Sequence, residues 1–550
     1  MDPAGPDSRP TSSTSTPPEA PAYDEGPKEE CGVFGVWAPG EEVSKLTYFG
    51  LFALQHRGQE AAGMAVSDGR QIVVFKDLGL VSQVFDEQTL SSLRGHLAVG
   101  HTRYSTTGSP TWENAQPTFR TTAAGTGLAL GHNGNLVNTA ELVRRRDAAL
   151  AVNGGPRNGH GGGNRRSSTL VGATTDSDVV TGLLADSAAD LGVEEAALRL
   201  LPDLQGAFSI AFCDETTLYA ARDRHGVRPL VLGRLDRGWV IASETAALDI
   251  VGASFVREVE PGELIAIDAE GLRSSRFAAP EPKGCIFEYV YLARPDTSIS
   301  GRGVHSARVE IGRRLAAEHP AEADLVIPVP ESGTPAAVGY AEASGIPYGM
   351  GLVKNAYVGR TFIQPSQTIR QLGIRLKLNP LREVIRGKRL VVVDDSIVRG
   401  NTQRSLVRML REAGALEVHV RIASPPVRWP CFYGIDFASR AELIANGLDD
   451  EGVRRSVGAD SLGYISQDGL IAATDQPRSR LCTACFSGEY PIPLPDEAMV
   501  GKHLLEDVTG ASCGDGGSGG PVAFEHGRSN GTGMPLGTPG YGAEDALSRP

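Results

Sequence analysis

Residues 389–402, R-L-V-V-V-D-D-S-I-V-R-G-N-T, constrain the fold more than any other stretch of the chain. Residues 390–393 are apolar and predict a short buried strand, which ends on the adjacent carboxylates Asp394 and Asp395. A helical pattern follows over 405–413. A loop that opens a helix offers free backbone N–H groups and the positive end of the helix dipole, and both suit a phosphate. The order strand, acidic pair, loop and helix therefore predicts a phosphate site at a strand end.

The two carboxylates need a separate explanation, because like charges repel a phosphate. Beside such a site, Asp394 and Asp395 fit ribose hydroxyls or a hydrated Mg2+. Ser396 and Thr402 add hydroxyl donors, and Gly400 lets the backbone approach a ligand closely. The alternative without a function is an ordinary strand end with an exposed Asp-Asp turn.

Strands and helices alternate through the C-terminal half of the chain. We expect helices over 304–317 and 333–343 and strands over 325–329, 390–393 and 417–423. This alternation predicts an α/β domain whose parallel sheet is covered on both faces. Ligands bind such sheets at the carboxyl ends of the strands, and a second polar loop, P-E-S-G-T at 330–334, also follows a strand.

The rest of the chain divides into segments of different amino-acid composition. Residues 1–30 are rich in Pro, Ser, Thr, Glu and Asp and are expected to be a disordered leader. Residues 31–270 are strand-rich and should form one domain, with a flexible, glycine-rich insertion at 151–167. The predicted α/β domain spans 271–495. An extension at 496–550 follows, expected to be disordered from about 508.

Cys31 opens the ordered sequence directly after the leader. If the leader is cut there, Cys31 becomes the first residue, and its own amine can act as the base for its thiol. A small buried cysteine is the alternative for a lone Cys. Three polar motifs follow it, however: H-T-R-Y-S-T from His101, G-H-N-G-N-L from Gly131 and T-D-S-D from Thr175.

These motifs, with L-Q-H-R-G-Q-E from Leu54 and R-D-R-H-G-V-R-P-L from Arg222, resemble class II glutamine amidotransferase domains of the N-terminal nucleophile hydrolase superfamily. The resemblance implies an α+β domain of stacked antiparallel sheets between helices. It also implies that Cys31 attacks the carboxamide of glutamine, giving a glutamyl thioester, then glutamate and ammonia.

The resemblance assigns the remaining residues of that site. The Asn133 side chain and the Gly134 N–H would hold the oxyanion. Arg103 would bind the α-carboxylate of glutamine in a bidentate pair, and Asp176 its α-ammonium.

Residues 389–402 in turn resemble the phosphoribosyl diphosphate (PRPP) loop of type I phosphoribosyltransferases. The resemblance implies that Asp394 and Asp395 hold the ribose hydroxyls together with Mg2+, and that Ser332 lies at the diphosphate and metal. Further PRPP-binding residues would be Ser396, Arg399, Gly400, Asn401 and Thr402 at the 5-phosphate, with Lys354 and Arg360 from a lid-like loop.

An amidotransferase region followed by a PRPP loop resembles the glutamine PRPP amidotransferases, which make 5-phosphoribosylamine in the first committed step of purine synthesis. The resemblance implies purine nucleotides as feedback inhibitors and a homodimer or homotetramer. Two alternatives are an amidotransferase that serves another acceptor, such as a sugar phosphate, and a non-catalytic PRPP-binding regulator.

Four cysteines are candidates for a metal site. The pair C-T-A-C at 482–485 alone allows a zinc half-site, a redox pair or no function, and four thiolates suit zinc or iron–sulfur chemistry equally. One branch of the family carries a 4Fe–4S cluster in motifs that match Cys285, Cys431, Cys482 and Cys485. By this resemblance the cluster would fasten the C-terminal segment to the catalytic domain rather than carry electrons.

Composition narrows the setting. The net charge of −13 disfavours a nucleic-acid-binding surface. No apolar run approaches the roughly 20 residues that span a bilayer, and the polar start is unlike an export signal. Seven cysteines in 550 residues are too few for a disulfide scaffold. A cytoplasmic enzyme without a membrane or nucleic-acid partner is expected.

Overall fold

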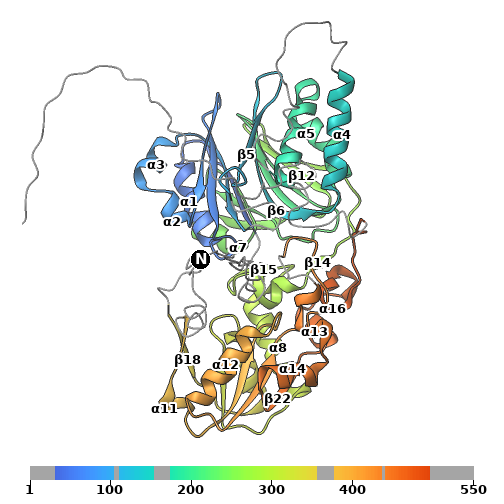
Figure 1. Ribbon diagram of the computed structural model, residues 1–550. Coiled ribbons are helices and arrows are strands. Elements are labelled where there is room, and N and C mark those ends of the chain that lie inside the picture. Colours follow the sequence, from blue (N-terminus) through green and yellow to red (C-terminus); the bar gives the residue numbers. More distant parts are fainter. Residues whose placement is uncertain (1–30, 105–110, 154–173, 356–376, 436–439, 496–550) are drawn as a thin grey trace, which may run out of the picture. The chain divides into compact units, whose positions relative to one another are not determined.

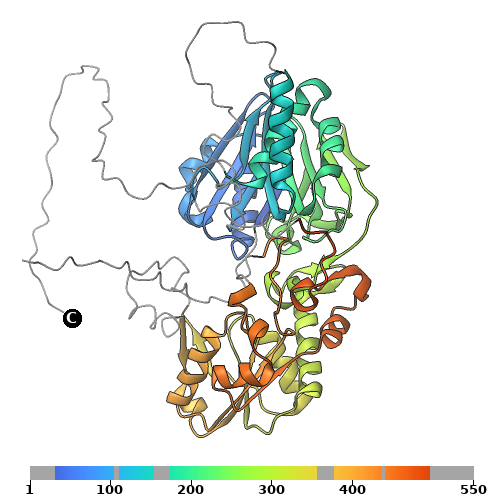
Figure 2. The same ribbon diagram turned by 45° about the vertical axis from the view of Figure 1, so that its right-hand side comes forward.

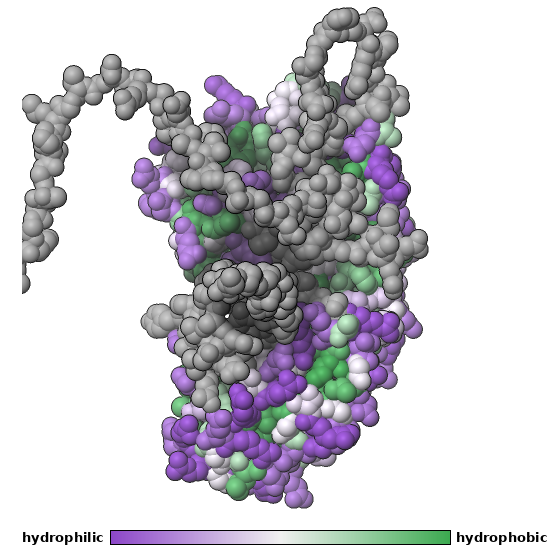
Figure 3. Space-filling view, viewed as in Figure 1, coloured by the Kyte–Doolittle hydropathy of each residue, from purple (hydrophilic) through white to green (hydrophobic). Residues whose placement is uncertain are grey.

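The computed structural model describes residues 31–104, 111–153, 174–355, 377–435 and 440–495 (Figure 1). The expected leader, residues 154–167 of the expected insertion, Arg360 and the extension from 496 lie outside this part of the chain. Within it, no helix is long and apolar enough to cross a membrane. Hydrophilic residues predominate on the face in Figure 3, and apolar residues form small separate patches.

The first sheet of the N-terminal domain is antiparallel, in the order β11-β9-β10-β1-β4-β2-β3. Its strands are β1 (Gly32–Trp37), β2 (Ala61–Ser67), β3 (Ile72–Leu78), β4 (Leu97–Arg103), β9 (Val231–Leu235), β10 (Gly238–Ala242) and β11 (Ser254–Glu258). The register pairs Gly32 of β1 with Thr102 of β4. Cys31, which directly precedes β1, therefore lies beside the end of the H-T-R motif.

A second antiparallel sheet has the order β13-β12-β8-β7-β6-β5. Its strands are β5 (Thr118–Thr121), β6 (Gly127–Leu136), β7 (Gly206–Cys213), β8 (Leu218–Arg222), β12 (Glu263–Asp268) and β13 (Gly271–Arg276). The domain boundary expected after residue 270 is wrong, because β13 pairs with β12 along its whole length and completes this sheet.

The two sheets pack face to face around a core that includes Val33, Val99, Ala129 and Ala211. Helices cover the outer faces (Figures 1 and 2). The first sheet carries α1 (Val43–Ala53), α2 (Val81–Val84), α3 (Glu87–Ser92) and α7 (Thr245–Ile250), and the second carries α4 (Thr139–Asn153), α5 (Asp176–Leu191), α6 (Val193–Leu200) and η1 (Leu201–Asp203). The layers confirm the predicted α+β domain of stacked antiparallel sheets.

The C-terminal domain is built on a parallel sheet in the order β17-β20-β21-β22. Its strands are β17 (Leu325–Pro328), β20 (Arg389–Asp394), β21 (Glu417–Ile422) and β22 (Ser461–Tyr464). Val391 and Val393 face a core formed with α8 (Val304–Glu318), α9 (Thr334–Ser344) and α15 (Gln467–Ala473). Leu390 and Val392 face α12 (Asn401–Glu412) and α14 (Asp450–Val457). Residues 390–393 are continuously apolar because both sheet faces are covered, which confirms the predicted α/β domain.

Shorter elements connect and close the two domains. They are β14 (Gly284–Cys285), η2 (Glu288–Leu292), β15 (Ser298–Ile299), β16 (Arg302–Gly303), β18 (Leu352–Lys354), β19 (Leu378–Pro380), α11 (Arg382–Ile385), η3 (Arg440–Glu442), α13 (Ile444–Gly447), η4 (Arg478–Arg480), β23 (Leu481–Cys482) and α16 (Ala484–Ser487). The parallel pair β14–β23 sets Cys285 directly opposite Cys482.

Helices α8 and α9 pack closely where two glycines lie at their contact. This close approach predicts that a larger side chain there would lower stability. A Cβ atom on Gly312 would lie 1.9 Å from the Ala336 carbonyl oxygen, so the helices must separate to admit one. We expect Gly312→Ala to lower the free energy of unfolding by about 3 kcal/mol, measured by urea denaturation. Gly447→Ala is the control, because its Cβ would meet nothing within 4 Å. Equal midpoints for the two variants would contradict this packing.

Candidate functional site

The thiol of Cys31 lies buried at the head of β1. Its Sγ donates to the Tyr104 carbonyl at 3.3 Å, and its exposed fraction is 6%. Burial raises the pKa of the thiol to about 11, while nearby Arg103 acts in the opposite direction. At neutral pH only about one thiol in ten thousand would be ionised, so this thiol would need a base to act as a nucleophile.

Asn133, in the middle of β6, is fully buried. Neither its Oδ1 nor its Nδ2 has a hydrogen-bond partner among the described residues. An unsatisfied buried amide costs about 1–3 kcal/mol per group, which an ordered water, an ion or a ligand can offset. The side chain therefore has a free donor of the kind that an oxyanion hole needs.

Backbone N–H groups along a β-strand point alternately to its two edges, and this alternation gives the direction of the Gly134 N–H. Two residues to either side, the His132 N–H donates to Gln116 Oε1 at 2.8 Å and the Leu136 N–H to Asp176 Oδ2 at 3.1 Å. The N–H of Gly134 points toward the same edge of β6, beyond the end of β5. Asn133 and Gly134 thus lie within a strand, and not in the tight turn that a motif of this kind also permits.

Arg103 and Asp176 are held at the same site. Arg103 ends β4, is 2% exposed and has an Nη1 atom 3.8 Å from Glu60 Oε2. Asp176 begins α5, and its carboxylate lies 3.6 Å from His132 Nδ1. Burial opposes ionisation, yet His132 and backbone donors keep the pKa of Asp176 below its usual value. A buried cation and a buried anion both act on the Cys31 thiol, an arrangement that suits an α-amino acid.

The second cluster lies at the carboxyl end of β20. Asp394 and Asp395 are both 6% exposed, and burial raises the pKa of each; Asp395 raises that of Asp394 further. The Ser396 hydroxyl donates to Asp395 at 2.6 Å, and Ser332 lies near enough to this carboxylate to lower its pKa against the effect of burial. Because β17 and β20 are parallel neighbours, both polar loops meet at one edge, as predicted.

The loop after the acidic pair opens α12 directly. Gly400 has a φ of +81° and is the residue before the helix, so α12 begins at Asn401 rather than at the expected residue 405. Asn401 Oδ1 accepts from Arg404, and Arg399 lies 3.4 Å from Glu442. The helix carries no side-chain cap, so the N–H groups of its first turn, which includes Thr402, face this loop.

Lys354 reaches the same edge from the antiparallel strand pair β18–β19. Its Nζ atom lies 3.7 Å from Glu331 in the P-E-S-G-T loop. Motif reasoning missed two residues beside the acidic pair. Gln403 Nε2 donates to Asp394, and Arg308, which is 3% exposed, acts electrostatically on Asp395. Gln403 directly follows the motif, in the first turn of α12, whereas Arg308 lies in α8 and comes near the acidic pair only through tertiary packing.

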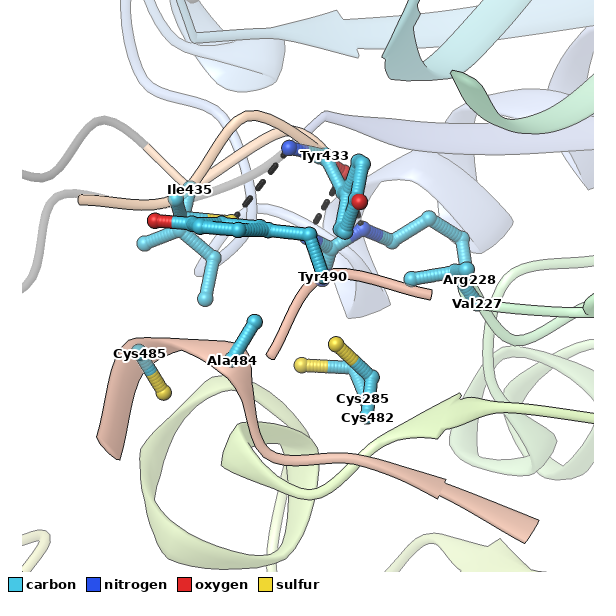
Figure 4. Close-up of a pocket in the computed structure, with 10 residues that line it drawn as sticks. Val227, Arg228, Cys285, Tyr433, Ile435, Cys482, Ala484, Cys485 and Tyr490 are labelled. Atoms are coloured by element: carbon cyan, nitrogen blue, oxygen red, sulfur yellow. Dashed lines mark hydrogen bonds between the residues drawn. The ribbon is translucent and has the colours of Figure 1, made fainter. Parts of the chain in front are cut away.

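The four candidate metal cysteines line one cavity, together with Arg228 and Tyr433 (Figure 4). Cys285 and Cys482 lie side by side, and Cys485 lies across the cavity from them. Burial raises the pKa of the Cys285 and Cys482 thiols to about 12 and also raises that of Cys485. Burial keeps these thiols protonated, and they lose their protons and become thiolates when a cationic group binds them.

The four cysteines supply a donor set of thiols around one shared space. Cysteine thiolates are the ligands that hold iron–sulfur clusters, and four of them also suit zinc. The donor set therefore fits an iron–sulfur cluster.

Known proteins share both halves of the chain. A glutamine amidotransferase domain matches residues 165–249, and a phosphoribosyl transferase domain matches residues 304–423. The amidophosphoribosyltransferase of Mycobacterium tuberculosis is 72% identical over 488 residues, which are 88% of this chain and 90% of that protein.

Two solved structures are also similar, each with 44% sequence identity. One is described as the allosteric regulatory enzyme of purine biosynthesis, with a TM-score of 0.78 over 86% of this chain and 99% of that one. The other is the glutamine PRPP amidotransferase of B. subtilis complexed with ADP and GMP, with a TM-score of 0.76 over 85% and 98%.

Proposed function

The chain belongs to the amidophosphoribosyltransferase family, and we propose how its residues divide the work of that enzyme. It transfers the amide nitrogen of glutamine to PRPP and yields 5-phosphoribosylamine, glutamate and diphosphate for purine biosynthesis. The observation that most supports our assignment is Asn133, a buried amide without a hydrogen-bond partner among the described residues. It lies on β6 between His132 and Leu136, both of which contact Asp176, and Asp176 and Arg103 both act on the Cys31 thiol.

The glutamine half begins at Cys31. Once the leader has been removed, the new α-amine takes the thiol proton, and the thiolate attacks the carboxamide carbon. The Asn133 amide and the Gly134 N–H stabilise the oxyanion that forms. Arg103 binds the α-carboxylate of glutamine and Asp176 the α-ammonium. The α-amine of Cys31 then passes the thiol proton to the departing nitrogen, so that ammonia leaves as the C–N bond breaks, and water hydrolyses the thioester to glutamate and the free thiol.

The second half takes place at the acidic pair. Asp394 and Asp395 hold the ribose hydroxyls, while N–H groups over 396–402 hold the 5-phosphate. Mg2+ fits the oxygen donors of Asp394, Asp395 and Ser332, and it would supply positive charge for the departing diphosphate. Lys354, and Arg360 outside the described residues, add further charge. Ammonia then attacks the anomeric carbon.

A direct test measures glutamate release from glutamine with and without PRPP and Mg2+. We expect PRPP to stimulate release strongly, because hydrolysis without an acceptor would waste ammonia. Equal release under both conditions would favour the alternative in which a different acceptor is served.

Mass spectrometry of active protein should show Cys31 as the first residue, and active protein that retains Met1 would contradict leader removal.

Two further assignments concern regulation and setting. The B. subtilis relative was solved with ADP and GMP bound, which supports feedback control by purine nucleotides here. We also propose that the protein forms a homodimer or a homotetramer, as the family resemblance implies. We place it in the cytoplasm, where the reducing conditions keep its thiols free.

We expect anaerobically purified protein to contain about four iron and four sulfide atoms per chain, held by Cys285, Cys431, Cys482 and Cys485. The cluster would fasten residues 481–487 to the catalytic domain. Elemental analysis and visible absorbance measure it. Cys485→Ser should lose the absorbance, whereas Cys213→Ala should retain it, because Cys213 is buried between the two sheets. Stoichiometric zinc without sulfide would contradict the cluster.

A further inference from the structure

A short segment of the C-terminal half touches the strand that carries the oxyanion residues. Residues 431–435, C-F-Y-G-I, are termed the strap. The Phe432 carbonyl accepts a hydrogen bond from Asn135 Nδ2 at 3.0 Å. Gly434 packs on the backbone of Gly134, because a Cβ atom built on Gly434 would lie 3.3 Å from the Gly134 Cα. Two consecutive β6 residues are therefore in contact with the strap.

The strap itself is fixed at several points. The Tyr433 carbonyl accepts from Arg228 Nε at 2.8 Å and from Arg228 Nη2 at 2.7 Å, and Arg228 is fully buried (dashed lines in Figure 4). The Tyr433 hydroxyl donates to the Ile492 carbonyl at 2.7 Å. The first strap residue, Cys431, lines the cysteine cavity. These bonds hold the Gly434 backbone in one place against β6.

The other end of the segment leads to the acidic pair. The Ala423 N–H, just after β21, donates to the Asp394 carbonyl at 2.8 Å. From Ala423 the chain runs through residues 424–430 to Cys431. One continuous stretch therefore connects the PRPP loop, the cysteine cavity and the oxyanion strand, although these lie in different domains.

We propose that the strap is a positioning element for glutamine hydrolysis, in which Gly434 and the Phe432 carbonyl set the place of the Gly134 N–H. This inference rests on the proposed role of Gly134. A donor that meets the oxyanion stabilises the transition state far more than bound glutamine, so a displaced donor lowers kcat and leaves KM nearly unchanged. Glycine is required at 434, because its φ is +119° and a methyl group would press on Gly134 and Arg228.

The main test is Gly434→Ala. We expect the glutamine-dependent kcat to fall at least about tenfold and the KM for glutamine to stay within about threefold, since complete removal of a donor costs roughly 10²–10³ in kcat. Synthesis from free ammonia and the cluster absorbance should be unchanged. Alkylation of Cys31 by iodoacetamide should also be unchanged, because this displacement forms no tetrahedral oxyanion.

Asn135→Ala is the second variant, because it deletes the hydrogen bond to Phe432 and leaves the strap backbone intact. It should shift kcat in the same direction by a smaller factor. Gly458→Ala is the matched control. Gly458 has a φ of +80° and terminates α14, where a Cβ atom would lie 3.9 Å from Val407. It imposes similar backbone strain without contact with β6, and its glutamine kinetics should equal those of the parent.

Two results would overturn the positioning role. One is a normal glutamine-dependent kcat in both Gly434→Ala and Asn135→Ala. The other is a parallel loss of glutamine use, ammonia use and cluster absorbance, which indicates general unfolding. Asn133→Ala separates this inference from the assignment beneath it. If Asn133→Ala retained full glutamine turnover, the oxyanion site itself would be wrong, whereas its loss together with unaffected strap variants would reject only the strap.

Discussion

Cys31→Ser should abolish the use of glutamine and leave synthesis from concentrated ammonia intact. The hydroxyl that replaces the thiol has a much higher pKa and is a far weaker nucleophile, so the glutamine-dependent rate should fall by at least about 10⁴. The acidic pair lies in the other domain and needs only ammonia and PRPP. Production of 5-phosphoribosylamine from each nitrogen source, measured on the same preparation, separates the two halves.

Cys213→Ala controls for the loss of a buried thiol. Cys213 is fully buried between the two sheets of the same domain, and burial raises the pKa of its thiol as it does for Cys31. Its replacement should lower stability slightly and leave both nitrogen sources usable. If Cys31→Ser also abolished ammonia-dependent synthesis while the protein stayed folded, two separable sites would be the wrong description.

Asp394→Asn should cripple the use of PRPP while leaving basal glutamine hydrolysis in place. The substitution keeps the size of the side chain and removes one of two adjacent buried carboxyl groups. The changed site attracts Mg2+ less strongly and accepts a hydrogen bond from a ribose hydroxyl less well. We therefore expect kcat/KM for PRPP to fall by roughly 10²–10³. The loss should appear with ammonia as well as with glutamine as the nitrogen source.

Asp324→Asn is the matched control for this variant. Asp324 precedes β17 at the opposite end of the same sheet and accepts hydrogen bonds from the Arg389 backbone and side chain. It should change stability without altering PRPP kinetics. An equal loss of PRPP use and of basal glutamine hydrolysis in Asp394→Asn would count against the assigned role, since the carboxylate is not part of the Cys31 cluster.

Local patterns predicted the main strands of the C-terminal sheet. The apolar run 390–393 lies in β20, and the strand expected over 417–423 matches β21. Boundaries were less accurate. The domain boundary at 270 missed β13, whose sequence G-L-R-S-S-R has little apolar periodicity because half-exposed edge strands need little. The start of α12 was missed because a left-handed glycine, and not a side-chain cap, precedes it.

The candidate residues were predictable where they lie in one motif. The residues alone indicated Cys31 and Asp394 as candidates, because each stands in a motif of chemistry-bearing residues. The role of Asn133 and the grouping of the four cysteines came from the family resemblance, since Cys285 and Cys431 lie far apart in the chain. Gln403, which directly follows the PRPP motif, and Arg308, which contributes to the acidic site from the distant helix α8, were not identified.

The sequence by itself determined which chemical groups are present and in what local arrangement: a cysteine at the end of a leader, an acidic pair after a buried strand, and a C-x-x-C. Only the tertiary structure decided which distant groups meet. Cys285 faces Cys482 through the β14–β23 pair, and Gly434 rests on Gly134. Such contacts depend on how whole domains pack, a property that neither periodicity nor spacing along the chain encodes.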